Sequence, residues 1–247
     1  MKSFAALFKN ELKLNIRNMN MVIFAVIMPL VVLIILGIIY GTKPAEEGAE
    51  YTFMEQYFGA LCAISMCAGG LMGLPLVVAE YRERKILKRF QVTPVSPLKL
   101  LFAELSIYVV YCIASMITLF PAAMLIWNVR MKGSLFAFLG SWLLTMISTL
   151  SIGMMVGGVA KNSKSASVIA SLLYFPMLVF SGVTLPFEVM PPVLQKIVSV
   201  FPLTQGIGLM KSTFLGLQPE NSWIAVAVMA AVTAVCTGIA VKFFKWE

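Results

Sequence analysis

Six long stretches of this 247-residue chain contain no charged side chain, and they constrain its fold more than any other feature. They cover residues 18–42, 56–79, 105–129, 133–160, 165–187 and 221–241. Each holds the roughly 20 residues that a helix needs to cross the hydrocarbon core of a bilayer. Charged residues make up 12% of the chain, against about 25% in soluble domains. We therefore predict an all-α membrane protein, one domain over 1–247, with transmembrane helices at about 21–41, 57–79, 105–128, 134–160, 166–184 and 222–243.

The distribution of basic residues predicts the orientation of the six spans. An even number of spans places both termini on one side of the membrane. If that side is the cytoplasm, cytoplasmic segments hold fourteen of the nineteen Lys and Arg residues and outer segments hold five. Because positive loops stay inside, we predict a multi-pass cell-membrane protein with both termini cytoplasmic. Nucleic-acid binding is disfavoured, since the basic residues flank spans and form no separate domain.

Residues 1–20 predict a basic amphipathic helix that lies in the membrane interface. Its apolar stripe repeats every four residues, at Phe4, Phe8, Leu12 and Ile16. A secretory signal is the alternative. The apolar run that follows is too long for one, and Lys43-Pro44 after it does not resemble a small-residue cleavage site.

The chain lacks the residues that most enzymes use. It has no His, and its eleven acidic residues are all Glu. This excludes HExxH zinc hydrolysis, Ser-His-Asp catalysis and aspartyl chemistry, and no GxxxxGK[ST] phosphate loop is present. The four cysteines lie inside apolar runs without a CxxC pair, so we interpret them as buried apolar residues. We predict no enzyme activity, no metal site and no cofactor in this chain.

Segment 80–98 carries the densest charge, between the second and third predicted spans. Residues 80–97 read Glu-Tyr-Arg-Glu-Arg-Lys-Ile-Leu-Lys-Arg-Phe-Gln-Val-Thr-Pro-Val-Ser-Pro, with five basic residues within eight positions. Tyr81, Ile86, Leu87 and Phe90 recur among them at roughly helical spacing. This predicts a short cytoplasmic helix with one apolar and one basic face, then a proline-broken turn. Ser96-Pro97 then predicts the start of a helix that runs into the third span.

Two functions of this segment are equally compatible with its residues. Its apolar face could dock into a groove on a partner while the basic residues pair with acidic groups. Alternatively, it sets topology and touches only lipid phosphate. Glu80 and Glu104, at the ends of the flanking spans, are either solvated carboxylates or braces that orient the basic loop.

Two spans contain glycines at GxxxG spacing. These are Gly69 and Gly73 in the second span and Gly153 and Gly157 in the fourth. Such glycines let backbones approach closely. Packing within the bundle is the favoured interpretation over a subunit interface or a substrate path.

Segment 185–216 is apolar but too interrupted to cross the bilayer as one straight helix. Pro186, Pro191 and Pro202 are among the residues that break it. We predict re-entrant or interfacial helices at the outer leaflet, between spans five and six.

No charged residue lies in the middle of a span, whereas ion-coupled carriers usually bury a titrating or ion-binding group there. This argues against a secondary transporter. It indicates that any energy for transport enters from another subunit through a cytoplasmic contact.

The chain resembles, over essentially its whole length, the membrane subunits of type-2 ABC exporters, the ABC-2 permease family. Residues 80–97 look like the family's Glu-Arg-Glu pattern, short helix and Thr-Pro-Val-Ser before the third span. Leu185–Phe187, Met190-Pro191 and Phe201–Thr204 are similar to its extracellular re-entrant hairpin. Many members have Gly where this chain has Lys85, so a continuous helix is expected here. The short loops resemble those of small antibiotic- and drug-export permeases.

The resemblance implies a coupling helix that docks on an ATPase subunit. The residues it assigns to coupling are Glu80, Arg82, Glu83, Arg84, Ile86, Leu87, Phe90, Thr93 and Pro94. We expect Ile86, Leu87 and Phe90 to form the docking face, with Arg82, Arg84, Lys88 and Arg89 at its rim. Two ATPase subunits carrying ATP–Mg and a second permease subunit, identical or homologous, are the implied partners.

The function we predict is therefore that of a permease subunit of an ATP-driven exporter. Its substrate would be amphipathic or hydrophobic, such as an antibiotic, a drug or a lipid. Met28, Met66, Met72 and Met177 could line a lateral path between facing subunits, although plain packing is the favoured interpretation of these residues. An ATPase-independent channel or secondary carrier is the main alternative, and a non-transporting anchor or sensor subunit is a third.

Overall fold

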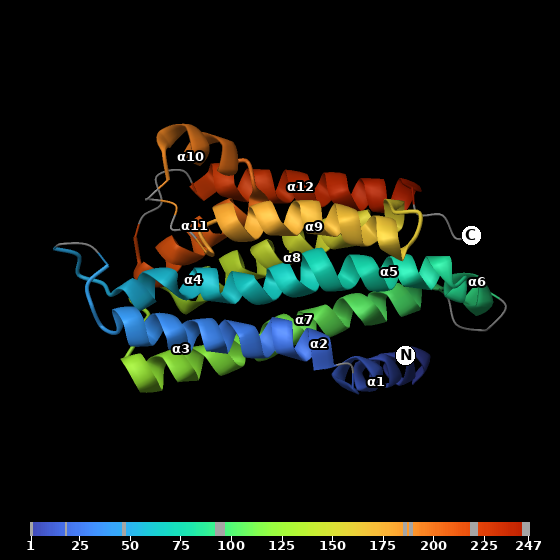
Figure 1. Cartoon of the computed structure of the whole chain (residues 1–247), viewed down its shortest axis with the longest axis horizontal. Coiled ribbons are helices and arrows are strands. Elements are labelled where there is room, and N and C mark those ends of the chain that lie inside the picture. The colour runs from blue at the N-terminus through green and yellow to red at the C-terminus, as the bar shows by residue number, and fades with distance from the viewer. Residues whose placement is uncertain are drawn as a thin grey trace.

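A computed structural model describes residues 2–17, 19–45, 48–91, 97–184, 187, 190–217 and 222–243. Its long helices lie side by side along the long axis of the molecule (Figure 1). Helix α1 (Lys2–Arg17), α6 (Ile86–Gln91) and the last turn of α12 (Ser222–Phe243) lie at one end, which we call the basic end. Helix α10 (Pro192–Val198) lies toward the opposite end.

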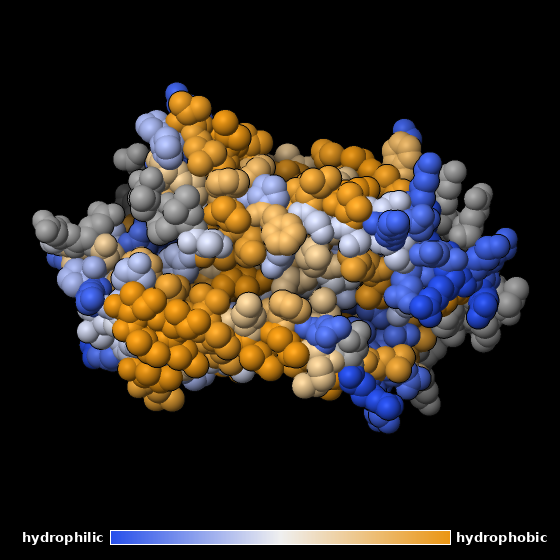
Figure 2. Space-filling model, viewed as in Figure 1, coloured by the Kyte–Doolittle hydropathy of each residue, from blue (hydrophilic) through white to orange (hydrophobic). Residues whose placement is uncertain are grey.

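The predicted all-α architecture with six spans is confirmed. Six helices of the described chain are long and apolar enough to cross a membrane. The first consists of α2 (Met19–Val22), η1 (Ile23–Ile27) and α3 (Met28–Tyr40), and the second of α4 (Phe53–Met66), η2 (Cys67–Gly73) and α5 (Leu74–Glu83). The others are α7 (Pro97–Trp127), α8 (Leu135–Val159), α9 (Ser163–Phe180) and α12. Hydrophobic side chains cover the middle of the visible face, and hydrophilic ones gather toward its ends (Figure 2).

The second span forms the centre of the bundle. In its most apolar window 83% of the residues are buried, against 17% for α9 and 22% for α12. It contacts α3, α7, α8, α9 and α11 (Pro202–Leu215). These elements are therefore packed around the second span.

The first two spans each contain a π-helical segment shortly before a proline. Segment η1 precedes Pro29 and η2 precedes Pro75. Proline lacks an N–H and its ring clashes with the carbonyl four residues earlier. A wider π turn relieves this conflict inside a helix that cannot otherwise break in lipid.

The four glycines at GxxxG spacing face other helices of the same chain. A Cβ on Gly153 would collide with the carbonyl oxygen of Gly70, and one on Gly157 would lie 2.7 Å from Cβ of Val78. Gly69 and Gly73 face the ring of Tyr108 on α7. Close approach of the second span to α7 and α8 therefore depends on these glycines.

Helices α10 and α11 meet at an angle of 101°, as a broken span or a re-entrant loop would. Pro191 is the residue that precedes α10, and Pro202 is the first residue of α11. Helix α11 is largely buried between α4 and α8. Pro186, also assigned to this segment, lies outside the described residues.

Candidate functional site

The chain turns sharply between α5 and α6 at the basic end. Helix α5 ends at Glu83, and Lys85 adopts a left-handed backbone conformation with φ of +55°. The prediction of a continuous helix through this region is therefore wrong. Lys85 has the conformation that glycine adopts at little cost, at the position where many members of the resembled family have glycine.

Arg82 binds the end of the fourth span. Its Nη1 donates to the carbonyl oxygens of Gly158 at 2.6 Å, Ala160 at 2.8 Å and Gly157 at 3.3 Å. These carbonyls belong to the C-terminus of α8, where the last acceptors of a helix lack intrahelical donors and the dipole favours a cation. Arg82 was expected at the rim of a docking face, but its guanidinium is engaged within the chain.

Glu83 binds the start of the fifth span. Its Oε2 accepts hydrogen bonds from the backbone N–H of Ser163 at 2.9 Å and from its hydroxyl at 2.6 Å. The side chain of Asn162 accepts from the N–H of Ser165 at 2.8 Å, so both residues cap the N-terminus of α9. Arg82 and Glu83 together hold the two sides of the turn between α8 and α9.

Tyr81 joins two further helices. Its phenol lies 2.7 Å from Oε1 of Glu104 on α7 and 3.0 Å from Oε2 of Glu11 on α1. Glu104 is fully buried. A phenol has one proton to donate, so both contacts are hydrogen bonds only when one of the carboxyl groups is protonated. Glu104 thus braces Tyr81, whereas Glu80 forms an exposed pair with Arg84 at 2.9 Å.

The apolar side of α6 packs on its own chain. Leu87 is 1% exposed and belongs to the main core, against which Ile86 also packs. This corrects the expectation that Leu87 faces a partner, because the side chain is already covered. Thr93, Pro94 and the side chain of Phe90 lie outside what the structure describes.

Four basic side chains remain exposed around the turn. We call Arg84, Lys85, Lys88 and Arg89 the basic patch. They stand on a segment that Tyr81, Arg82, Glu83 and Leu87 fix to the bundle. The sequence assigned most of these residues to one site but did not reveal the partners Glu11, Gly158 and Ser163. Asn162-Ser163 is a recognisable helix start, but nothing in the sequence links it to Glu83.

The fold and this site define a helical, multi-spanning membrane protein that exposes a rigidly held basic patch at one end. The model of the ABC-2 type transporter family matches residues 2–215. The chain belongs to this family.

Named relatives are transport permeases. The chain is 26% identical over 195 residues to the inner membrane transport permease YhhJ of Escherichia coli K12, covering 76% of this chain and 52% of that protein. It is 25% identical over 166 residues to the probable multidrug ABC transporter permease YbhS of the same organism, with coverages of 66% and 44%. With the putative transport permease YvfS of Bacillus subtilis it shares 22% over 188 residues, covering 76% and 75%.

The chain therefore spans about half the length of the first two relatives. The inner-membrane relative and the six apolar spans both indicate that this chain lies in the membrane. The protein is a multi-pass protein of the bacterial plasma membrane.

Proposed function

We propose that this chain is the membrane subunit of an ATP-driven exporter, and that an ATPase subunit docks on the basic patch. The observation that carries the proposal is the last turn of α5. Tyr81, Arg82 and Glu83 bind α1, α7, α8 and α9 while the same turn leads directly into α6. A force applied to α6 is thereby distributed to four other helices.

Two features suit α6 to transmit a displacement. Leu87 anchors it to the core, so that it moves with the second span and not as a loose loop. Arg82 and Glu83 hold the 160–163 turn, so that a shift of α5 also pulls on α8 and α9. ATP and Mg²⁺ would be bound by the partner, and this chain would supply the lever and the path.

The chemistry of the patch supports an acidic surface on the partner. Arg84, Lys85, Lys88 and Arg89 are exposed and close together along the chain. An acidic groove on the ATPase would complement them, which favours rapid and oriented association. Because Leu87 is buried, it cannot contribute apolar contact to this interface. The interface therefore relies more on charge than the sequence alone indicated.

The proposed substrate is a hydrophobic or amphipathic small molecule or a lipid. The printed name of one relative, a probable multidrug ABC transporter permease, supports this class. Met19–Tyr40 and α9 bury little of their surface within the chain. A second permease subunit, identical or homologous, would cover them and complete a lateral path.

Affinity purification from native membranes tests the docking surface. The wild-type chain is expected to retain a soluble nucleotide-binding protein and to support vanadate-sensitive transport in vesicles. Reversing the charge at Lys88→Glu and Arg89→Glu should remove both. The matched control, Lys161→Glu with Lys164→Glu, makes the same charge change on the α8–α9 side of the basic end and should leave the partner bound.

The competing function, an ATPase-independent channel or carrier, gives a different result. Vesicles that contain only this protein would then move substrate without nucleotide. That outcome, or full ATPase retention by the Lys88 and Arg89 double variant, contradicts the proposal.

A further inference from the structure

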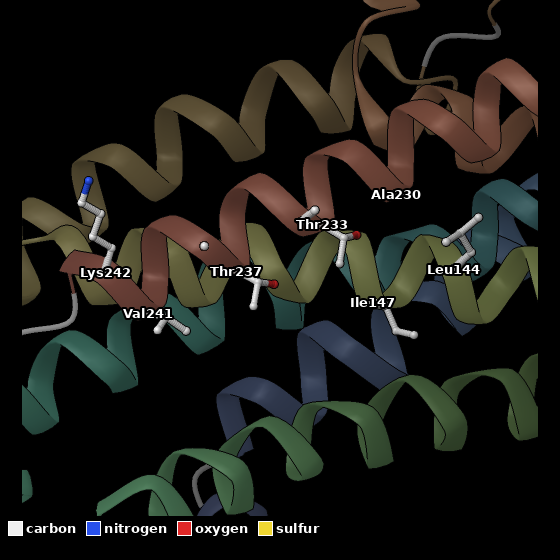
Figure 3. A pocket seen from close by; sticks show the side chains of 9 residues that line it. Leu144, Ile147, Ala230, Thr233, Thr237, Val241 and Lys242 are labelled. Carbon is white, nitrogen blue, oxygen red and sulfur yellow. The ribbon is translucent and has the colours of Figure 1, made fainter.

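An apolar groove runs between α7, α8 and α12 and contains none of the basic-patch residues in its lining. Figure 3 shows the part of it that lies along α12 and α8. Two adjoining hollows of about 460 and 670 Å³ share Ile147, Thr233, Thr237 and Val241. The 460 Å³ hollow, which three helices line, falls within the roughly 300–1,000 Å³ of ligand pockets, whereas the other is a more open continuation of it.

The groove has a buried floor and exposed walls. Leu101, Leu150 and Ala240 are at most 8% exposed and form the floor, whereas Phe102 and Val241 are 57% and 76% exposed and form the rims. Three helices contribute, so an occupant is contacted from three directions. This differs from the flat apolar surface of a single span, on which a lipid chain meets one helix.

The length of the groove matches one leaflet of a bilayer. Its lining on α12 extends from Ala230 to Lys242. The twelve residue-to-residue steps between them rise about 18 Å, and one leaflet contributes about 15 Å of hydrocarbon. The groove begins at the basic end, which the excess of Lys and Arg assigns to the cytoplasm. It therefore spans the cytoplasmic leaflet.

A lysine stands at the basic end of two of the three helices that line the groove. Lys99 follows the lining residue Leu98 on α7, and Lys242 follows Val241 on α12. Both lysines are exposed, and none of the residues that line the groove is acidic. In Figure 3 the amine of Lys242 points away from Thr237, so reaching a headgroup requires rotation of its long, flexible side chain.

We propose that this groove binds an anionic phospholipid of the cytoplasmic leaflet. One acyl chain lies on the floor formed by Leu101, Leu150 and Ala240, and the phosphate lies between Lys99 and Lys242. Apolar burial holds the chain, and the two lysines select the charge of the headgroup. The site is separate from the basic patch and does not depend on the proposed transport function.

Lipid association measured on the full chain tests the site. The purified protein is reconstituted in phosphatidylcholine vesicles that contain spin-labelled phosphatidylglycerol or spin-labelled phosphatidylcholine. The wild type is expected to prefer the anionic probe, and native mass spectrometry should detect one retained phosphatidylglycerol per chain. Lys99→Gln with Lys242→Gln should reduce the preference about fivefold per lysine, the equivalent of about 1 kcal/mol each.

A second variant tests the apolar part of the groove. Thr237→Trp places a large ring in its centre and should abolish retention of either lipid, because the acyl chain no longer fits. The control Leu125→Trp puts the same ring on an 85% exposed position near the other end of α7. The control Lys161→Gln with Lys164→Gln removes two charges at the same end of the bundle. Both controls should retain the lipid with wild-type preference.

Several results would overturn the proposal. These are equal association of both probes with the wild type, an unchanged preference in the Lys99 and Lys242 double variant, and retained lipid in Thr237→Trp. A disulfide between copies carrying Val241→Cys would identify the groove as a contact between permease subunits instead. Melting temperatures in pure phosphatidylcholine verify that each variant is folded.

Discussion

Nη1 of Arg82 lies 2.6 Å from the carbonyl oxygen of Gly158, so a side chain at the end of the second span caps the C-terminus of the fourth span. The next residue, Glu83, carries the opposite charge, and its carboxylate caps the N-terminus of the fifth span. A cation at the helix C-terminus and an anion at the following helix N-terminus both favour the dipoles they face. Two consecutive side chains thus fix the α8–α9 turn to α5.

The first prediction concerns this pair of helix caps. Arg82→Gln should lower the free energy of unfolding by about 1.5–3 kcal/mol, the range for hydrogen bonds to a charged group. Thermal unfolding of the detergent-solubilised protein measures the loss. Arg84→Gln is the control, because the Arg84 side chain is 69% exposed and forms one pair with Glu80. Its removal should cost well under 1 kcal/mol, and equal losses in both variants would contradict the capping role.

Lys85 gives the second prediction. A non-glycine residue at φ of +55° carries a backbone cost of roughly 1–2 kcal/mol. Lys85→Gly should therefore raise the stability by about 1 kcal/mol, measured as an increase in melting temperature. Asn128 is the matched control, since it has φ of +52° but asparagine tolerates this region. Asn128→Gly should gain less, and an equal or larger gain there would contradict this explanation.

The spans could be predicted from the sequence because one physical requirement, about 20 apolar residues, leaves a strong signal in a single stretch of chain. Local capping signals were also readable. Ser96-Pro97 predicts a helix start; α7 begins at Pro97, and Ser96 lies outside the described residues. The helix of the second span begins at Phe53, after a capping box formed by Thr52 and Glu55. The predicted start was later because it was placed after the last charged residue.

The candidate site was harder to predict because its side chains bind partners distant in the sequence. Arg82 and Leu87 have the composition of a docking face, yet one caps α8 and the other packs in the core. Neither contact leaves a local pattern. The continuous helix predicted through Lys85 failed for a different reason. Lysine has a good helix propensity, but α6 can pack on the core only if the chain turns at this residue.

The third prediction concerns the contact between the second and fourth spans. Gly153→Ala should destabilise the protein by about 1–3 kcal/mol, because its Cβ would overlap the carbonyl oxygen of Gly70, a backbone atom that cannot rotate away. Gly140→Ala, on the same helix, is the control, since its Cβ would have no neighbour within 4 Å. That change should be neutral or slightly stabilising. Chemical denaturation in mixed micelles distinguishes the two variants, and similar midpoints would show that the helices separate easily.

The last prediction concerns Tyr81. Tyr81→Phe removes the hydroxyl that contacts both Glu11 and Glu104 and leaves Oε1 of the fully buried Glu104 without this donor. An unsatisfied buried group of this kind costs about 1–3 kcal/mol. Because the same hydroxyl also contacts α1, trypsin should cut faster at Lys9, Lys13 and Arg17 in the variant. Glu11→Gln keeps an acceptor oxygen for the phenol, so cleavage there should stay near the wild-type rate. If Tyr81→Phe leaves α1 as protected as in the wild type, packing of Leu7, Phe8 and Leu12 on the core holds this helix, and the phenol does not.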